Sequence, residues 1–272
     1  MSSLRSVVQK SSLAMLGALL FAFAAPAPAA DLGLEPSIRG ANVLFAGTFE
    51  RLGASNLSLL PASDATAIVR VREVIEQPAM FNDLRDASVT VRLADLSGVV
   101  EGGQAIFLTI GSMWGENLGV QEILRLPSRS PETEAADLLR VRGEVARVRS
   151  LEADEELSAR LESAEVVIFG RVGEVREIER GREDFGEHAA SWSFAPLQIE
   201  QTLKGREAGG VYFARDTDFF WGASPKLGPG QDGIFLLQPY PGRDLPRGSY
   251  VVVDALDVQP RTELERVRGL LR

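Results

Sequence analysis

The feature that most constrains the fold is a motif that occurs twice. Residues 103–112 read GQAIFLTIGS and residues 230–240 read GQDGIFLLQPY, so both begin with Gly-Gln and lead into Ile-Phe-Leu. Two further pairs occur in the same order: GANVLFAG (40–47) with SAEVVIFG (163–170), and Ile75-Glu76-Gln77 with Ile199-Glu200-Gln201. Their separation increases slowly along the chain, as loop insertions between strands would produce. The three matches together predict an internal duplication.

The repeated segments have the pattern of β-strands. Residues 65–75, ATAIVRVREVI, and 87–96, ASVTVRLADL, alternate aliphatic residues with Thr or Arg, and residues 249–258, SYVVVDALDV, are rich in β-branched residues. Glycine clusters separate these segments. Each copy has room for about five strands in about 90 residues, which suits a small closed barrel. We therefore expect a mainly β protein with two tandem five-stranded OB-like barrels, at residues 31–127 and 163–260, that superpose on the strands of Ile106 and Ile234.

The alternation also predicts which side chains form the core of the second barrel. Val166, Ile168, Phe235 and Leu237 share one face of their strands and are expected to be buried. Val167 and Phe169 lie on the other face, where a helix between the copies would cover them.

Between the copies, the spacing of the apolar residues changes from that of a strand to that of a helix. Residues 128–162 therefore predict a helical connector. Ser130 followed by Pro131 is a helix start signal. Leu138, Val141, Val145 and Val148 then follow at helical spacing, and residues 152–163 predict a second short helix. A further helix is expected at the end of the chain, within residues 261–272.

Residues 1–30 have the order of a secretory signal peptide. Arg5 and Lys10 precede an apolar run at 13–25, and the small residues of PAPAA follow it. The alternatives are a buried core helix and a membrane anchor, but the run is shorter than the roughly 20 residues that a spanning helix needs. Cleavage is expected after Ala29, or else after Ala30. We expect an exported protein, periplasmic or extracellular, with no transmembrane segment in the mature chain.

Composition excludes several classes of function. The chain has no Cys, so disulfides, a lipidated N-terminal Cys, thiolate metal sites and Cys nucleophiles are excluded. Its net charge of -9, more negative once the leader is removed, would repel the phosphates of nucleic acid and an anionic membrane surface. Nucleic acid is therefore not expected as a partner.

The second copy carries a recognisable order of elements. AEVVIFGRV (164–172), QTLKG (201–205) and GQDGIFLLQP (230–239) follow one another. This order resembles the netrin-like, tissue-inhibitor-of-metalloproteinase-like OB barrels of secreted proteins, although the first copy has EQPAM (76–80) in place of the Lys-Gly element. The resemblance implies a fold and secretion. The inhibitors of this group reach the protease zinc through an N-terminal Cys, and this chain, which has none, cannot use that mechanism.

The sequence contains no recognisable catalytic, cofactor-binding or metal-binding motif. Its one His, His188, lies in the polar segment RGREDFGEHAA (180–190), as solvated loop residues do. G-x-S-x-G, Walker and G-x-G-x-x-G motifs are absent, and one His cannot make a zinc site. We expect no cofactor and no bound metal.

One segment without a counterpart in the first copy is a candidate partner-binding surface. It combines two acidic and three aromatic residues, which are Asp216, Asp218, Phe219, Phe220 and Trp221. Aromatic side chains anchor interfaces, so an exposed cluster would bind a partner. The alternative is that the rings plug the end of the barrel while the acids stay solvated. A calcium site would need more oxygen ligands than this segment offers.

Three functions remain open from the sequence. The first is a non-catalytic binding or scaffolding protein of the cell envelope, with a protein or glycan as its partner. The second is an inhibitor of a secreted enzyme that acts through a loop. The third is a hydrolase with two catalytic carboxylates. The chain has many acidic residues but no recognisable catalytic motif.

Overall fold

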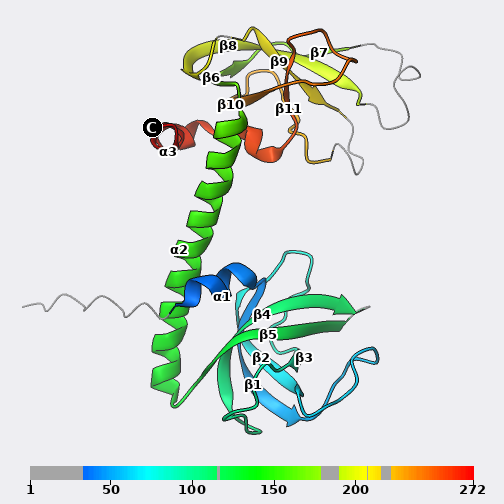
Figure 1. The fold of residues 1–272 in the computed structure, drawn as a ribbon, viewed down its shortest axis with the longest axis vertical. Coiled ribbons are helices and arrows are strands. Elements are labelled where there is room, and N and C mark those ends of the chain that lie inside the picture. Colours follow the sequence, from blue (N-terminus) through cyan, green and yellow to red (C-terminus); the bar gives the residue numbers. More distant parts are fainter. Residues whose placement is uncertain (1–32, 115–116, 179–189, 207, 216–221) are drawn as a thin grey trace, which may run out of the picture. The chain divides into compact units, whose positions relative to one another are not determined.

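A computed structural model describes residues 33–114, 117–178, 190–206, 208–215 and 222–272. These residues form a mainly β chain with two closed five-stranded barrels, a long helix and a short C-terminal helix (Figure 1). The predicted fold class is therefore confirmed. The predicted leader, residues 1–30, lies outside the described residues.

The first barrel follows a short helix, α1 (Leu34–Gly40). Its strands are β1 (Val43–Leu52), β2 (Thr66–Glu76), β3 (Ser88–Arg92), β4 (Gln104–Trp114) and β5 (Asn117–Pro127). They close in the order β1-β2-β3-β5-β4. The β3–β5 pair is parallel, and the other pairs are antiparallel.

The second barrel repeats this arrangement. Its strands are β6 (Val166–Val172), β8 (Trp192–Lys204), β9 (Gly210–Ala214), β10 (Asp232–Pro239) and β11 (Tyr250–Val252). The circuit runs β6-β8-β9-β11-β10, again with one parallel pair, β9–β11. Two short strands are added: β7 (Arg176–Glu177) pairs with β8, and β12 (Val258–Gln259) pairs with the start of β10. The two copies therefore share one strand order, as a duplication requires.

The pairing registers align the copies residue by residue. Ile106 pairs with the residue before Gly47, and Ile234 pairs with the residue before Gly170. Both glycines also follow a register shift, a β-bulge, against the next strand. Both positions favour glycine. A Cβ on Gly170 would lie 2.4 Å from the carbonyl oxygen of Gln198, and one on Gly47 would lie 2.5 Å from a methyl carbon of Val69 and 3.0 Å from the carbonyl oxygen of Arg70.

One of the three sequence matches is out of register. Gly47 pairs with Val71, and Gly170 pairs with Ile199, so Ile199 corresponds to Val71 and not to Ile75. The shared Ile-Glu-Gln letters are a coincidence. The other two matches agree with the pairing.

The predicted core of the second barrel is confirmed. Val166, Ile168, Phe235 and Leu237 are at most 1% exposed and belong to one interior cluster. Val167 and Phe169 lie in a second cluster on the outside of the barrel, where Leu157 and Leu161 of the long helix cover them, as predicted.

The connector is one helix, α2 (Pro131–Ser163), and the prediction of two helices was wrong. Ser130 caps it by accepting a hydrogen bond from the amide of Thr133, and Pro131 occupies its first turn. The buried residues Val141, Val145 and Val148 form one strip. Leu157 comes 16 residues after Val141, and at about 100° per residue its strip lies nearly opposite. Because the two strips lie on opposite faces, no single apolar face runs along the whole helix. The sequence pattern therefore resembles that of two separate helices.

Charged residues attach α2 to both barrels. From β2, Glu73 pairs with Arg142 and Glu76 pairs with Arg149. From β8, the ammonium of Lys204 donates to the carbonyl oxygens of Leu161 (2.7 Å) and Glu162 (2.9 Å) in the last turn. Cations favour this end of a helix, where carbonyls lack intrahelical partners. The other described lysine, Lys226, also donates to a carbonyl oxygen, that of Ala214.

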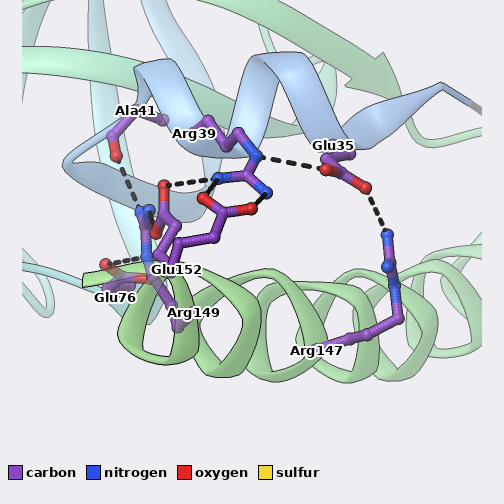
Figure 2. Close-up of polar contacts among 8 residues, drawn as sticks. Glu35, Arg39, Ala41, Glu76, Arg147, Arg149 and Glu152 are labelled. Carbon is purple, nitrogen blue, oxygen red and sulfur yellow. Dashed lines mark hydrogen bonds and ion pairs between the residues drawn. The ribbon is translucent and has the colours of Figure 1, made fainter. Parts of the chain in front are cut away.

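An ion-pair network joins α1 to α2 (Figure 2). The guanidinium of Arg39 in α1 binds both carboxylate oxygens of Glu155 at 2.9 Å. Arg149 lies on the other side of the network, where it binds Glu76 and donates to the carbonyl oxygen of Ala41 at 2.8 Å. One arginine of α2 thus holds both β2 and the turn between α1 and β1.

The chain ends against the outside of the second barrel. Two short 3-10 helices (Ala255–Asp257 and Arg261–Glu263) lead into α3 (Leu264–Leu270), whose Val267 is fully buried beside Leu157 and Leu161. The guanidinium of Arg261 lies 4.8 Å from the ring centre of Phe169. A C-terminal helix therefore forms within the predicted range.

We expect Gly170→Ala to destabilise the protein by about 3 kcal/mol, because its Cβ would collide with a backbone oxygen that cannot turn away. Gly143→Ala in α2 is the control. Its Cβ meets nothing within 4 Å, and it should stabilise the helix by about 0.5–1 kcal/mol. Urea unfolding measures both, and equal midpoints for the two variants would contradict the close approach at the bulge.

We expect Arg149→Ala to lower the free energy of unfolding by about 1–3 kcal/mol, because it leaves the carbonyl of Ala41 and the carboxylate of Glu76 without this donor. Arg147→Ala is the matched control on the same helix. Its ion pairs with Glu35 and Glu144 are more exposed, and their loss should cost less than about 1 kcal/mol. A larger loss for Arg147→Ala would refute this ranking.

Candidate ligand-binding groove

The residues that the sequence singled out for function lie outside the described residues. The candidate partner-binding segment, with Asp216, Asp218, Phe219, Phe220 and Trp221, follows directly on β9, and His188 precedes β8. The prediction that this segment binds a partner stays a prediction.

A second aromatic surface is present on the described part of the second barrel. Phe194 of β8, Tyr212 of β9 and Tyr250 of β11 line an open hollow of about 460 Å³. The hairpin between β8 and β9 contributes residues 208–210, and the loop before β11 contributes Pro246, Arg247 and Gly248. We call this hollow the aromatic groove.

Strand alternation directs two of these rings outward. In β9, Val211 and Phe213 face the barrel interior, and Tyr212 between them faces away. In β8, Ala195 and Leu197 face the interior, so Phe194 also faces out. The two residues are register partners, and their ring centres lie 5.0 Å apart at a tilt of 52°. Both rings remain half-buried, so each keeps surface for a ligand.

A glycine allows the ring of Phe194 to lie across β9. A Cβ at Gly210 would come within 2.4 Å of this ring, so any other residue would displace it. The neighbouring Gly209 has open space around it, because a Cβ there would meet nothing within 4 Å. The hairpin therefore presents bare backbone to the groove.

The wall of the groove before β11 is fixed by one carboxylate. Asp244 accepts a hydrogen bond from the indole of Trp192 at 2.6 Å and another from the hydroxyl of Tyr240. The rings of Trp192 and Tyr240 pack edge to face, with centres 5.1 Å apart. Burial, together with the bond to Asp244, raises the pKa of Tyr240, which keeps its hydroxyl protonated as a donor. Leu245 is buried in the same cluster, so the backbone that leads into residues 246–248 is held in place.

The first barrel has a smaller hollow on the corresponding face. It measures about 140 Å³ and is lined by side chains that include Arg92, Ile110 and Gln121. Arg92 pairs with Thr66 as Tyr212 pairs with Phe194, so the registers put Arg92 in the place of Tyr212. The two barrels share this face, but only the second carries aromatic rings there.

Three described carboxyls are buried, and each has a structural partner; Glu134 pairs with Arg72 and lines neither hollow. Burial raises the pKa of Glu122, whose carboxylate lies 3.1 Å from the guanidinium of Arg125. Burial also raises the pKa of Asp257, which accepts hydrogen bonds from the amides of Val253 (2.8 Å) and Asp254 (3.0 Å). Neither of these two carboxyls lines the hollows above. Within the described ranges, no group of three or more His, Asp or Glu residues is arranged to hold a metal ion.

No helix in the described part of the chain has the length and apolarity needed to cross a membrane.

The aromatic groove has a sequence signal that the repeat analysis did not use. Trp192 and Phe194 are two residues apart in one strand, so they must share a face, and Tyr212 follows in the next strand. The loop that returns beside them is not visible from strand patterns, because it is fixed by the side chain of Asp244.

We expect Asp257→Asn to gain stability over the parent as pH rises. An unfolded Asp ionises near pH 3.9. The folded pKa of Asp257 is higher, so the stability that the protonated group provides is complete below the unfolded pKa and is lost as pH rises through the folded one. Asn keeps an acceptor for both amides and does not ionise. Unfolding free energies should therefore diverge in favour of the variant with increasing pH and then run parallel. Profiles that are parallel throughout would contradict the assignment.

No protein-family model matches the chain, and a search of curated proteins gave no similar sequence.

Proposed function

We propose that the chain is an exported, non-catalytic binding protein of the cell envelope and that the aromatic groove holds its ligand, a glycan or a protein segment. The observation that carries the proposal is the joining of Phe194, Tyr212 and Tyr250 in one hollow. Export rests on the leader pattern of residues 1–30 and on the resemblance to netrin-like barrels.

The size and composition of the groove support binding. Its volume of about 460 Å³ falls in the range of about 300–1,000 Å³ that is usual for ligand sites. Aromatic rings provide large contact areas at a small cost in side-chain entropy, and they dominate the binding energy of many interfaces. Phe194 and Tyr212 are held by their strands and by each other, so little ordering is required when a ligand arrives.

The face of the barrel supports the same conclusion. OB-type barrels bind extended ligands on the face of their second and third strands, between the flanking loops. β8 and β9 are these strands of the second barrel, and the loop between β10 and β11 forms one wall of the groove.

Gly209→Trp should weaken ligand binding at least tenfold while the unfolding midpoint stays unchanged. The indole would occupy the groove, and the substitution removes no native contact, because a Cβ at Gly209 meets nothing within 4 Å. Binding would be measured for the mature protein on an array of envelope polysaccharides and on immobilised envelope proteins.

Gly143→Trp is the matched control, since it adds the same side chain at an open position of α2. It should bind as the parent does. The groove would be excluded as the site if Gly209→Trp bound the same ligands as strongly as the parent, or if the two variants lost binding equally.

A further inference from the structure

We infer that the ligand of the aromatic groove is an acidic saccharide chain, one whose sugar rings carry carboxylates. This inference rests on the function proposed above. It adds the chemical class of the ligand. The charge and the exposed backbone of the groove are the observations that support it.

The charge of the groove differs from that of the chain. Acidic residues outnumber Lys and Arg by 38 to 29 in the whole sequence, yet the lining of the groove contains no Asp or Glu and one Arg, Arg247. The carboxylate of Glu165 is held close by, where it accepts the hydroxyl of Tyr250 at 2.7 Å. The lining itself therefore offers one cation and no acid, and the carboxylate at its edge is engaged by Tyr250.

Arg247 is available for a ligand. Its side chain makes no hydrogen bond or ion pair within the part of the chain that the structure describes, and the residue is exposed on the loop that Asp244 anchors. A guanidinium binds a carboxylate through two parallel hydrogen bonds, in a geometry that an ammonium cannot provide. Arg247 is therefore suited to an anionic group with two acceptor oxygens, such as a carboxylate.

The remaining lining matches a sugar better than a peptide. The half-buried rings of Phe194 and Tyr212 offer flat apolar surface to the C–H face of a pyranose. The surface beside Gly209 and Gly248 is open, because a Cβ at either position meets nothing within 4 Å, so a sugar hydroxyl can approach their backbone closely. The groove is shallow and open, without the deep apolar pocket in which a peptide side chain would be anchored.

The negative charge of the whole chain does not oppose this ligand strongly. Charges more than about 8 Å away are largely screened at physiological ionic strength, whereas the lining is in direct contact with the ligand. A short acidic saccharide also has fewer charges than a nucleic acid of the same binding-site length, because the duplex carries one per about 1.7 Å.

The hollow of the first barrel has the same charge pattern. Arg92 is its one charged lining residue, and no acid lines it. The linings of both hollows thus contain an arginine and no acid, so the same charge pattern occurs in both barrels.

The test uses calorimetric titration of the mature protein with two matched probes, hexagalacturonate and its methyl ester. In the ester, each carboxyl carries a methyl group in place of its negative charge. The acid should bind, and the ester should bind at least tenfold more weakly. Arg247→Gln should weaken binding of the acid about tenfold and leave binding of the ester unchanged.

Charge variants at Gly209 separate charge from volume. Gly209→Gln and Gly209→Glu place nearly isosteric side chains in the groove, and Gly209→Lys places a cation there. Affinity for hexagalacturonate should fall in the order Lys, Gln, Glu, with unchanged unfolding midpoints for all three. The ester should not distinguish Gln from Glu.

The outcomes separate this inference from the proposed function. Equal affinity for acid and ester that Gly209→Trp abolishes would overturn the acidic ligand and leave the groove as a binding site. Binding of envelope proteins but of neither saccharide, again lost in Gly209→Trp, would overturn the saccharide alone. Binding of the acid that survives both Gly209→Trp and Arg247→Gln would overturn the inference and the proposed site together.

Discussion

The closure of both barrels depends on the approach of two strands at a glycine. Gly170 lies so close to the backbone of Gln198 that no side chain fits, and Gly47 occupies the same place in the first barrel. Each glycine follows a β-bulge, which bends its strand so that one segment pairs with two neighbours. The two barrels share this bend and one strand order, and the aromatic groove lies on the outward face of the second and third strands of the second barrel.

One position in the second strand of each barrel carries an acidic residue in the first barrel and a basic residue in the second. Glu76 pairs with Leu44, and Lys204 pairs with Val167, at corresponding places in the registers. Glu76 binds an arginine within α2, whereas Lys204 binds the carbonyls at its end. The Leu-Lys-Gly element that distinguishes the second copy therefore has a local physical role. Lys204 caps the helix, and Gly205 has a φ of +76° and no room for a side chain, because a Cβ there would lie 2.3 Å from the carbonyl oxygen of Glu165.

The sequence was sufficient for the architecture, because strand alternation and glycine positions are local signals. It identified the interior residues of β6 and β10 and even the outer pair, Val167 and Phe169, that α2 covers. It failed where the deciding contacts join distant residues. The continuity of α2 depends on two opposed strips whose partners lie in different barrels, and the wall of the groove depends on Asp244 meeting Trp192. The repeated Ile-Glu-Gln motif suggested a wrong alignment for the same reason, because the register is set by strand pairing and not by local sequence identity.

The use of both described lysines as carbonyl ligands has a chemical consequence. With Lys204 bound to the end of α2 and Lys226 bound to the carbonyl of Ala214, the positive charge that this part of the folded chain presents to solvent is almost entirely guanidinium. Arginine stays protonated at any pH a cell encounters and does not acylate readily. Acylation of Lys204 removes the cation that binds the last carbonyls of α2, so reagents that attack primary amines are expected to weaken the attachment of the second barrel to this helix end.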